Sequence, residues 1–167
     1  MESTSKFHAG IVFVTNSAQD EKISEIENII GKLLAKIGGI IKDTQIIQDN
    51  LDEISNVLLD LCDDKGFRLI ITVGGTGLSN QDNTPEATSR VVDKEIPGFS
   101  EAMRMETFKI TKRAILSRGI TGFRGKSMIL NLPASPSGVS QCLDVVIDAI
   151  PHAISLIDGN VNNCTDD

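Results

Sequence analysis

A glycine-rich stretch in the middle of the chain has the residue types of a phosphate-binding loop. It contains Gly74, Gly75, Thr76 and Gly77, directly after the apolar run 69–73, which predicts a buried strand. Glycine adopts positive φ angles and lets another group approach the backbone closely. We therefore expect these four residues to bind phosphate. Taken alone, they also fit a plain tight turn between a strand and a helix.

A lone carboxylate, Asp82, follows this loop, and a helix start comes directly after it. Thr84-Pro85-Glu86 predicts an N-cap, a proline in the first helical turn and an acid beside it. The amino end of a helix attracts anions. The loop is neither a P-loop nor a dinucleotide fingerprint, because no Gly-Lys-Ser/Thr follows and Asn80 stands where the third glycine belongs.

A second carboxylate, Asp49, follows another predicted strand. Asn50 with Glu53 resembles a capping box, so Asp49 lies one position outside the helix with no local partner; the alternative is that Asp49 itself caps that helix. Ligands of open α/β sheets bind beyond the carboxyl ends of the strands. We expect Asp49 and Asp82 to meet at that edge as catalytic residues that hold Mg²⁺ beside a triphosphate.

Apolar runs and helical patterns alternate along the chain. Strands are expected at 7–15, 40–47, 68–73 and 127–131, with a short one at 114–116, and amphipathic helices lie between them. Pro151 is expected to end or kink the last helix. This order predicts one α/β domain over residues 7–158: a three-layer α/β/α sandwich with a mostly parallel sheet. Residues 1–6 and 159–167 are expected to be flexible tails.

The composition of the chain limits the classes of molecule that it is expected to bind. The net charge is −7 and the chain has no Trp or Tyr, which argues against nucleic acid. Residues 104–126 carry seven bases and one acid, a net +6, so the remainder carries −13. This segment is either a solvated face or a patch for a small anion.

The sequence also indicates a cytoplasmic protein. We expect no membrane partner, since no eighteen-residue apolar segment stands out. The first residues lack the basic start and apolar core of a secretory signal. Three scattered cysteines, Cys62, Cys142 and Cys164, lack zinc-ligand spacing, and we expect reduced thiols.

Several motifs in order carry a specific resemblance. Gly74–Gly77 and Asp82–Ala87 are followed by 95–99, 116–118, 122–126 and Leu130-Asn131-Leu132-Pro133-Ala134-Ser135-Pro136. Together they resemble the signature of the molybdopterin adenylyltransferase family, which includes the gephyrin G domain. The resemblance runs from about residue 8 to 158 and implies a molybdopterin-binding-like fold.

The resemblance implies a reaction and a substrate for each part of the site. The family transfers AMP from Mg·ATP to molybdopterin and releases pyrophosphate, as part of molybdenum cofactor biosynthesis. The resemblance assigns pterin binding to four residues, Asn16, Ser17, Ser117 and Arg118. Ser135 and Pro136 belong to a loop that faces the active site and binds phosphate through a hydroxyl and helix amides. It also implies a homo-oligomer, commonly a trimer.

Three residues depart from the family pattern. Asn16 and Gln81 stand where the family usually has Asp and Arg, and Ala134 where it has Gly. The first two favour an alternative, a pterin- or nucleotide-binding carrier or scaffold with weak or no transferase activity. A nucleotide-pyrophosphate hydrolase is a third possibility, for which no base is specified.

Overall fold

A single mixed sheet forms the centre of the computed structural model, which describes residues 6–17 and 20–160. In the described part of the chain its strand order is β2-β1-β3-β6-β5-β4. The strands are β1 (Phe7–Val14), β2 (Gly39–Ile47), β3 (Leu69–Val73), β4 (Lys94–Glu95), β5 (Thr121–Arg124) and β6 (Ser127–Leu132). The four strands β2, β1, β3 and β6 are parallel, and β5 and β4 add an antiparallel edge.

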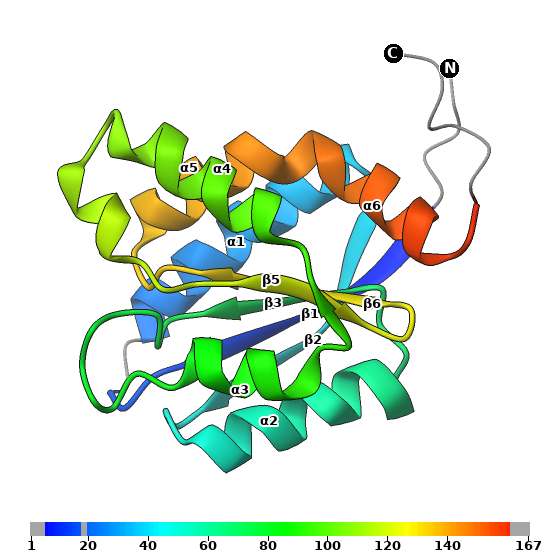
Figure 1. The fold of residues 1–167 in the computed structure, drawn as a ribbon, viewed down its shortest axis with the longest axis horizontal. Helices are drawn as coiled ribbons and strands as arrows, with labels where there is room; N and C mark the ends of the chain where they lie inside the picture. The colour runs from blue at the N-terminus through cyan, green and yellow to red at the C-terminus, as the bar shows by residue number, and fades with distance from the viewer. Residues whose placement is uncertain (1–5, 18–19, 161–167) are drawn as a thin grey trace.

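Helices cover both faces of this sheet (Figure 1). One face carries α1 (Asp20–Lys36), α4 (Pro97–Phe108), α5 (Pro136–Val146) and α6 (Ile150–Ile157), and the other carries α2 (Leu51–Leu59) and α3 (Thr84–Val91). Short helical turns follow α2 (Asp60–Asp64), α4 (η2, Lys112–Leu116) and α5 (Ile147–Ala149). The predicted three-layer α/β/α sandwich is therefore confirmed.

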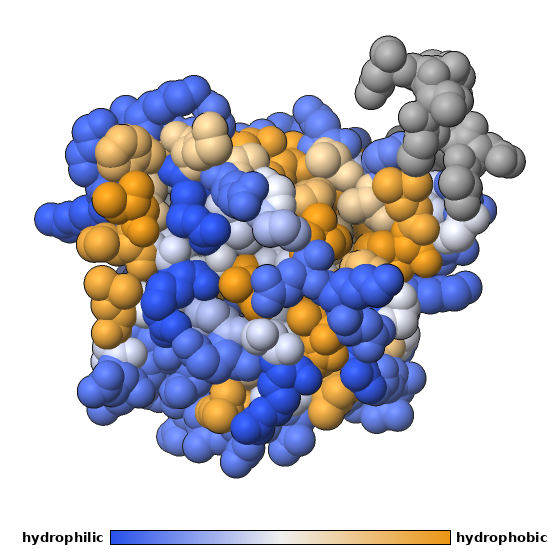
Figure 2. Space-filling view, in the orientation of Figure 1, coloured by the Kyte–Doolittle hydropathy of each residue, from blue (hydrophilic) through white to orange (hydrophobic). Residues whose placement is uncertain are grey.

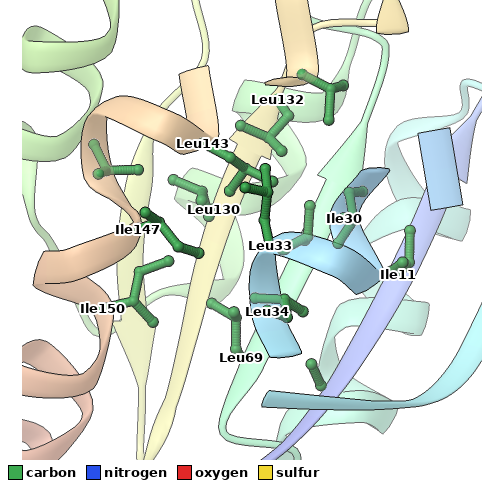
Figure 3. Packing of buried hydrophobic residues seen from close by; sticks show 14 of the residues in the cluster. Ile11, Ile30, Leu33, Leu34, Leu69, Leu130, Leu132, Leu143, Ile147 and Ile150 are labelled. Carbon is green, nitrogen blue, oxygen red and sulfur yellow. The ribbon is translucent and has the colours of Figure 1, made fainter. Parts of the chain in front are cut away.

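Burial on both faces explains why the central strands are mostly apolar. Leu69 and Ile71 of β3 belong to the core beneath α1 and α5, whereas Ile70 packs in the second core beneath α2 and α3. Alternate side chains of a strand point to opposite faces, so a strand covered on both faces has apolar side chains at most positions of either face. Figure 3 shows Leu33 of α1 and Leu143 of α5 packing over β6.

The strand order reverses at β1, which lies between β2 and β3. The loops that leave β1, β2, β3 and β6 at their carboxyl ends begin at Thr15, Gln48, Gly74 and Pro133. Thr15 N–H donates to Ile47 O at 2.9 Å, and Gly74 N–H donates to Leu132 O at 3.0 Å. These bonds join the end of β1 to that of β2 and the end of β3 to that of β6, at the edge where ligands of open sheets bind.

Two predictions of strands need correction. The segment 114–116, expected as a strand, lies in the 3₁₀ turn η2, and Ile115 is 60% exposed. Its apolar side chains find no core, so no strand pairing forms there. Conversely, β5 was not predicted, because Gly122 interrupts its apolar pattern. It forms because the turn at Gly125, with φ +52°, folds it back on β6.

Helix boundaries agree better with the sequence. Asn50 Oδ1 accepts from the amides of Asp52 and Glu53, both at 3.0 Å, as the N-cap of α2. The break before Pro151 is confirmed by the 3₁₀ turn that separates α5 from α6. The prediction that Thr84 is the N-cap of α3 was wrong, because Thr84 is the first residue of that helix and Asn83 is the N-cap.

Most residues of the two predicted tails cannot be compared with the structure. Residues 1–5 and 161–167 lie outside the described residues, and so does Cys164.

One expectation about membranes was too strong. The joined helical stretch Pro136–Ile157 is long and apolar enough, by length and composition alone, to cross a bilayer. A core helix passes the same test because one face must be apolar. Here Val139, Leu143 and Ile150 are fully buried in the core between this stretch and the sheet.

Candidate functional site

The glycine loop after β3 has the backbone that only glycine adopts readily. Gly74 has φ +100° and Gly75 has φ +67°. A side chain on Gly74 would overlap Val14 O at the end of β1. The first glycine therefore allows close approach of two strand ends, and the second turns the chain toward the edge where ligands bind.

Asp49 lies against the second glycine of this loop. Its Oδ1 accepts hydrogen bonds from the backbone N–H of Asn83 at 2.9 Å and from Asn83 Nδ2 at 3.2 Å. A Cβ on Gly75 would lie 2.7 Å from Asp49 Oδ2 and would overlap Thr84 Oγ1. The absence of a side chain at position 75 is thus what makes room for the Asp49 carboxylate.

Asp82 has the same relation to the third glycine. Its Oδ2 accepts from Ser79 N–H at 2.9 Å, and a Cβ on Gly77 would lie 2.9 Å from that oxygen. Each carboxylate therefore rests on one glycine of the loop. This arrangement places Asp49 and Asp82 at one edge of the sheet, as the order of the strands predicts.

The environment of Asp49 disfavours its charged form. Burial raises the pKa of the Asp49 carboxyl, two hydrogen bonds from Asn83 oppose this shift, and the charges of Asp82 and Glu86 add to it. Three acids are therefore close enough to affect one another. An arrangement of this kind favours a cation, because a cation offsets the repulsion that the acids experience without it.

The donors available here fit Mg²⁺ shared with a nucleotide. In the described part of the chain, no three His, Cys, Asp or Glu side chains are grouped to hold a metal alone. Within the residues that the structure describes, Asp49 Oδ2 and Asp82 Oδ1 accept no hydrogen bond. The buried hydroxyl oxygen of Thr84 also has no hydrogen-bond partner there. Mg²⁺ prefers oxygen, keeps several waters and takes few protein ligands when phosphate supplies the rest.

Asn16 holds the backbone of Asp49. Its Oδ1 accepts from Asp49 N–H at 3.0 Å, so the loop after β1 fixes the loop after β2. The amide oxygen provides the acceptor that an aspartate would provide, without a further negative charge beside Asp49. Ser17 lies nearby in a depression of about 220 Å³ that Lys22 and Ala134 also line. Lys22 supplies a cation to this depression and was not predicted as a site residue from the sequence.

A cavity of about 420 Å³ lies between α4, η2 and α5. Two predicted residues line it, Ser117 and Ser135. Ser135 is the N-cap of α5, and its Oγ accepts from Gly138 N–H at 3.1 Å. This places the start of α5 on the cavity wall, where its amides face an anion favourably. Of the predicted phosphate-binding residues, Ser135 lines this cavity.

Three further polar residues line this cavity, Arg104, Asn131 and Gln141. Sequence reasoning included Arg104 only as one base of the segment 104–126 and did not assign Asn131 or Gln141 to a site. Arg104 comes from α4 and Gln141 from α5, so their proximity depends on how two helices pack. Asn131 lies on β6, where its Nδ2 donates to Thr72 Oγ1 at 2.8 Å and to Thr88 Oγ1 at 2.9 Å. The motif that contains Asn131 was a signal that could have identified it.

Ser117 and Arg118, paired in the sequence prediction, serve different regions. Ser117 faces the cavity. Arg118 reaches the glycine loop, where Nε donates to Gly77 O at 2.7 Å and Nη2 donates to Asp82 O at 2.9 Å. Its Nη1 forms an ion pair with Glu86. Because the guanidinium is occupied by the loop, the geometry gives Arg118 contacts with the nucleotide-side residues and none with the cavity.

The basic segment 104–126 does not form one patch. Lys109 pairs with Glu106 at 2.7 Å and Arg124 pairs with Asp63 at 2.7 Å, in addition to the pair of Arg118. Of the seven bases, Arg104 and Arg113 line the cavity. The positive charge of the cavity therefore comes from two arginines, and the other cations are spread over the surface.

Known proteins are similar to this chain in sequence. The family described as "Probable molybdopterin binding domain" matches residues 15–152. The molybdopterin adenylyltransferase of Helicobacter pylori is 46% identical over 116 residues, which cover 70% of this chain and 66% of that protein, just under two thirds of its length. The enzyme of the same name from Haemophilus influenzae is 34% identical over 173 residues, covering 93% of this chain and 87% of that protein.

Solved structures with similar sequences also have a similar fold. The molybdopterin biosynthesis enzyme MoaB from Thermus thermophilus superposes with a TM-score of 0.83 at 39% identity, covering 92% of this chain and 97% of that one. The Mog protein from Mycobacterium ulcerans gives a TM-score of 0.80 at 34% identity, covering 90% and 99%.

Proposed function

The chain belongs to the probable molybdopterin binding domain family, and on this premise we propose that it is a molybdopterin adenylyltransferase of molybdenum cofactor biosynthesis. Two relatives bearing that enzyme name support the proposal. An oxygen of the terminal phosphate of molybdopterin attacks the α-phosphorus of ATP. The bond from that phosphorus to the bridging oxygen of the β-phosphate breaks, and pyrophosphate leaves with the electron pair.

This chemistry requires positioning more than proton transfer. The nucleophile is a phosphate oxygen that is already charged, so no side chain must remove a proton from it. The described residues match this requirement, because the acids at the sheet edge have no histidine among their hydrogen-bond partners. Their role is to hold two anions close together and to neutralise the charge that this produces.

The observation that carries the proposal is the seating of two carboxylates on Gly75 and Gly77. Asp49 Oδ2 and Asp82 Oδ1 would hold Mg²⁺, which when bound neutralises phosphate charge and polarises the α-phosphorus. Backbone amides of Gly75, Thr76 and Gly77 would contact the phosphates of ATP.

The cavity between α4 and α5 would take the pterin. Its volume suits a ligand of that size, and Ser117, Ser135 and Arg104 supply polar contacts on its wall. Arg113, the other arginine that lines the cavity, suits an anionic substituent, since guanidinium binds phosphate in a fork geometry. Asn16 and Ser17 lie outside this cavity, so any pterin contact that they make involves a part of the molecule that extends toward β1.

A homo-oligomer, commonly a trimer by resemblance, is part of the proposal. Figure 2 shows apolar surface over α4 and η2, where Met105, Ile110, Ile115 and Leu116 are exposed. Exposed apolar patches favour association. We place the protein in the cytoplasm because Cys62 and Cys142 are buried free thiols, as expected in a reducing compartment.

A carrier or scaffold is the second candidate, and Gln81 is the observation that favours it. Its side chain is exposed and neutral beside the glycine loop, so a phosphate there would lack the cation that the resembled family usually has. Asn16 no longer supports this alternative, because it keeps the acceptor for Asp49 N–H.

Incubation with Mg·ATP, with and without molybdopterin, separates the possibilities. The proposal predicts release of pyrophosphate that depends on the pterin. Turnover without pterin would indicate a hydrolase, and tight binding of both ligands without turnover would indicate the carrier.

A further inference from the structure

The segment Ser117–Ile120 lies between the cavity and the glycine loop. It has no regular secondary structure and connects η2 to β5. Asn131 anchors its end on β6, because Ile120 N–H donates to Asn131 Oδ1 at 3.1 Å and Asn131 N–H donates to Ile120 O at 3.1 Å. We name this segment the strap.

Two arginines hold the strap from opposite sides. On the cavity side, Arg104 Nη1 donates to Gly119 O at 2.8 Å and to Ser117 O at 3.4 Å. On the other side, Arg118 N–H donates to Thr76 O at 3.0 Å. Its guanidinium then reaches Gly77 O and Asp82 O, the two ends of the turn that carries Asp82.

This arrangement forms a continuous chain of contacts from the cavity wall to the catalytic carboxylates. Arg104 fixes the strap, the strap carries Arg118, and Arg118 fixes the backbone of Asp82. The amide of the next residue, Asn83, donates to Asp49 Oδ1. The position of Arg118 therefore influences both carboxylates, although its side chain contacts neither of them.

Building on the proposed function, we propose that Arg118 and Arg104 are positioning residues for adenylyl transfer. They set the position of Asp82 and Asp49 through the strap. A lysine cannot replace Arg118 in this role, because one ammonium group lacks the planar fork that reaches Gly77 O, Asp82 O and Glu86 together. An electrostatic role alone, by contrast, would survive that replacement.

Arg124 supplies a matched control. Its guanidinium is paired with a carboxylate, Asp63, and donates to a backbone carbonyl, Val91 O, at 3.2 Å. The Arg124 side chain is 31% exposed, against 34% for Arg118. Arg124→Ala therefore removes a similar set of contacts at a distance from the glycine loop.

The first test is amide hydrogen exchange of the ligand-free protein over residues 77–83. The amides of Ser79 and Asn83 report directly on the carboxylates that they contact. Arg118→Ala and Arg118→Lys should speed exchange there by roughly 10- to 100-fold, the effect of losing a charge-assisted hydrogen bond that limits local opening. Arg104→Ala should act in the same direction, and Arg124→Ala should leave these amides unchanged.

The second test is steady-state kinetics at a temperature where all variants are folded. Both Arg118 variants should lower kcat by about 10- to 100-fold, because misplaced catalytic groups slow the chemical step, with little change in KM for ATP. The proposal is overturned if exchange over 77–83 is the same in Arg118→Ala and Arg124→Ala, or if Arg118→Lys restores kcat. If the unmodified protein transfers no AMP, the proposed function fails, and the exchange data still decide whether the strap positions the carboxylates.

Discussion

Gly75→Ala should damage the site far more than its size suggests. Gly75 has φ +67°, and the new Cβ would lie 2.7 Å from Asp49 Oδ2 and overlap Thr84 Oγ1. The left-handed backbone costs roughly 1–2 kcal/mol for a residue with a side chain. Displacing Asp49 from the amide of Asn83 adds about 1.5–3 kcal/mol, toward the lower end because the carboxylate is partly exposed.

Gly66→Ala is the matched control for the backbone. Gly66 has φ +63°, and a Cβ there meets nothing within 4 Å. The Gly66→Ala variant should be destabilised only by the roughly 1–2 kcal/mol that the left-handed conformation costs. Its rate of adenylyl transfer should match that of the unmodified protein. Denaturant unfolding measures the difference in free energy between the two variants.

The rates of adenylyl transfer distinguish Gly75→Ala from Gly66→Ala more clearly than their unfolding free energies do. Because Gly75→Ala moves a carboxylate that we assign to Mg²⁺, the rate of adenylyl transfer should fall by about 100-fold at a temperature where both variants are folded. Equal rates for Gly75→Ala and Gly66→Ala would show that the packing of Asp49 against position 75 does not matter for the reaction. The glycine at position 75 would then be required for the turn alone, and not for seating Asp49.

Three further substitutions test neighbouring groups. Asp82→Asn should remove most turnover and leave the unfolding free energy nearly unchanged; near-normal rates at saturating Mg²⁺ would contradict its metal-binding role. Asp49→Asn should raise the thermal midpoint at pH 7, because the pKa of Asp49 is raised above 3.8, so its charged form destabilises the fold as pH rises through the folded pKa. That gain should vanish below pH 3.8, and a gain that persists in acid would exclude this cause. Gln81→Arg should strengthen ATP binding at low salt by less than about 1 kcal/mol, since the site is exposed, with calorimetry at high salt as the control.

The fold could be predicted from the sequence where the signal is local. The apolar strands and the helices between them follow from periodicity, and the edge that carries Asp49 and Asp82 follows from their place after two strands. The structure confirms that placement because the loops after parallel strands meet at one edge. It also gives a reason for the glycines at 75 and 77 that composition alone does not show, namely the carboxylates packed against them.

The rest of the site depends on packing between distant segments. Arg104 and Gln141 meet across two helices that are far apart in sequence, and no local pattern marks such a contact. Ser117 and Arg118 are neighbours, yet successive side chains of an extended segment point to opposite sides. One therefore faces the cavity and the other the glycine loop. The prediction of a strand at 114–116 was wrong because Ile115 and Leu116 are exposed in a 3₁₀ turn, which sequence alone does not reveal.

In the proposed reaction, the loop carboxylates and the cavity between α4 and α5 bring ATP and the pterin phosphate together. A single-turnover reaction with ATP labelled at the α-phosphorus, Mg²⁺ and enzyme-bound molybdopterin tests it most directly. We expect the label to move to the pterin and one pyrophosphate to appear for each adenylyl group transferred. Label recovered as free AMP, or left in ATP while both ligands are bound, would contradict it.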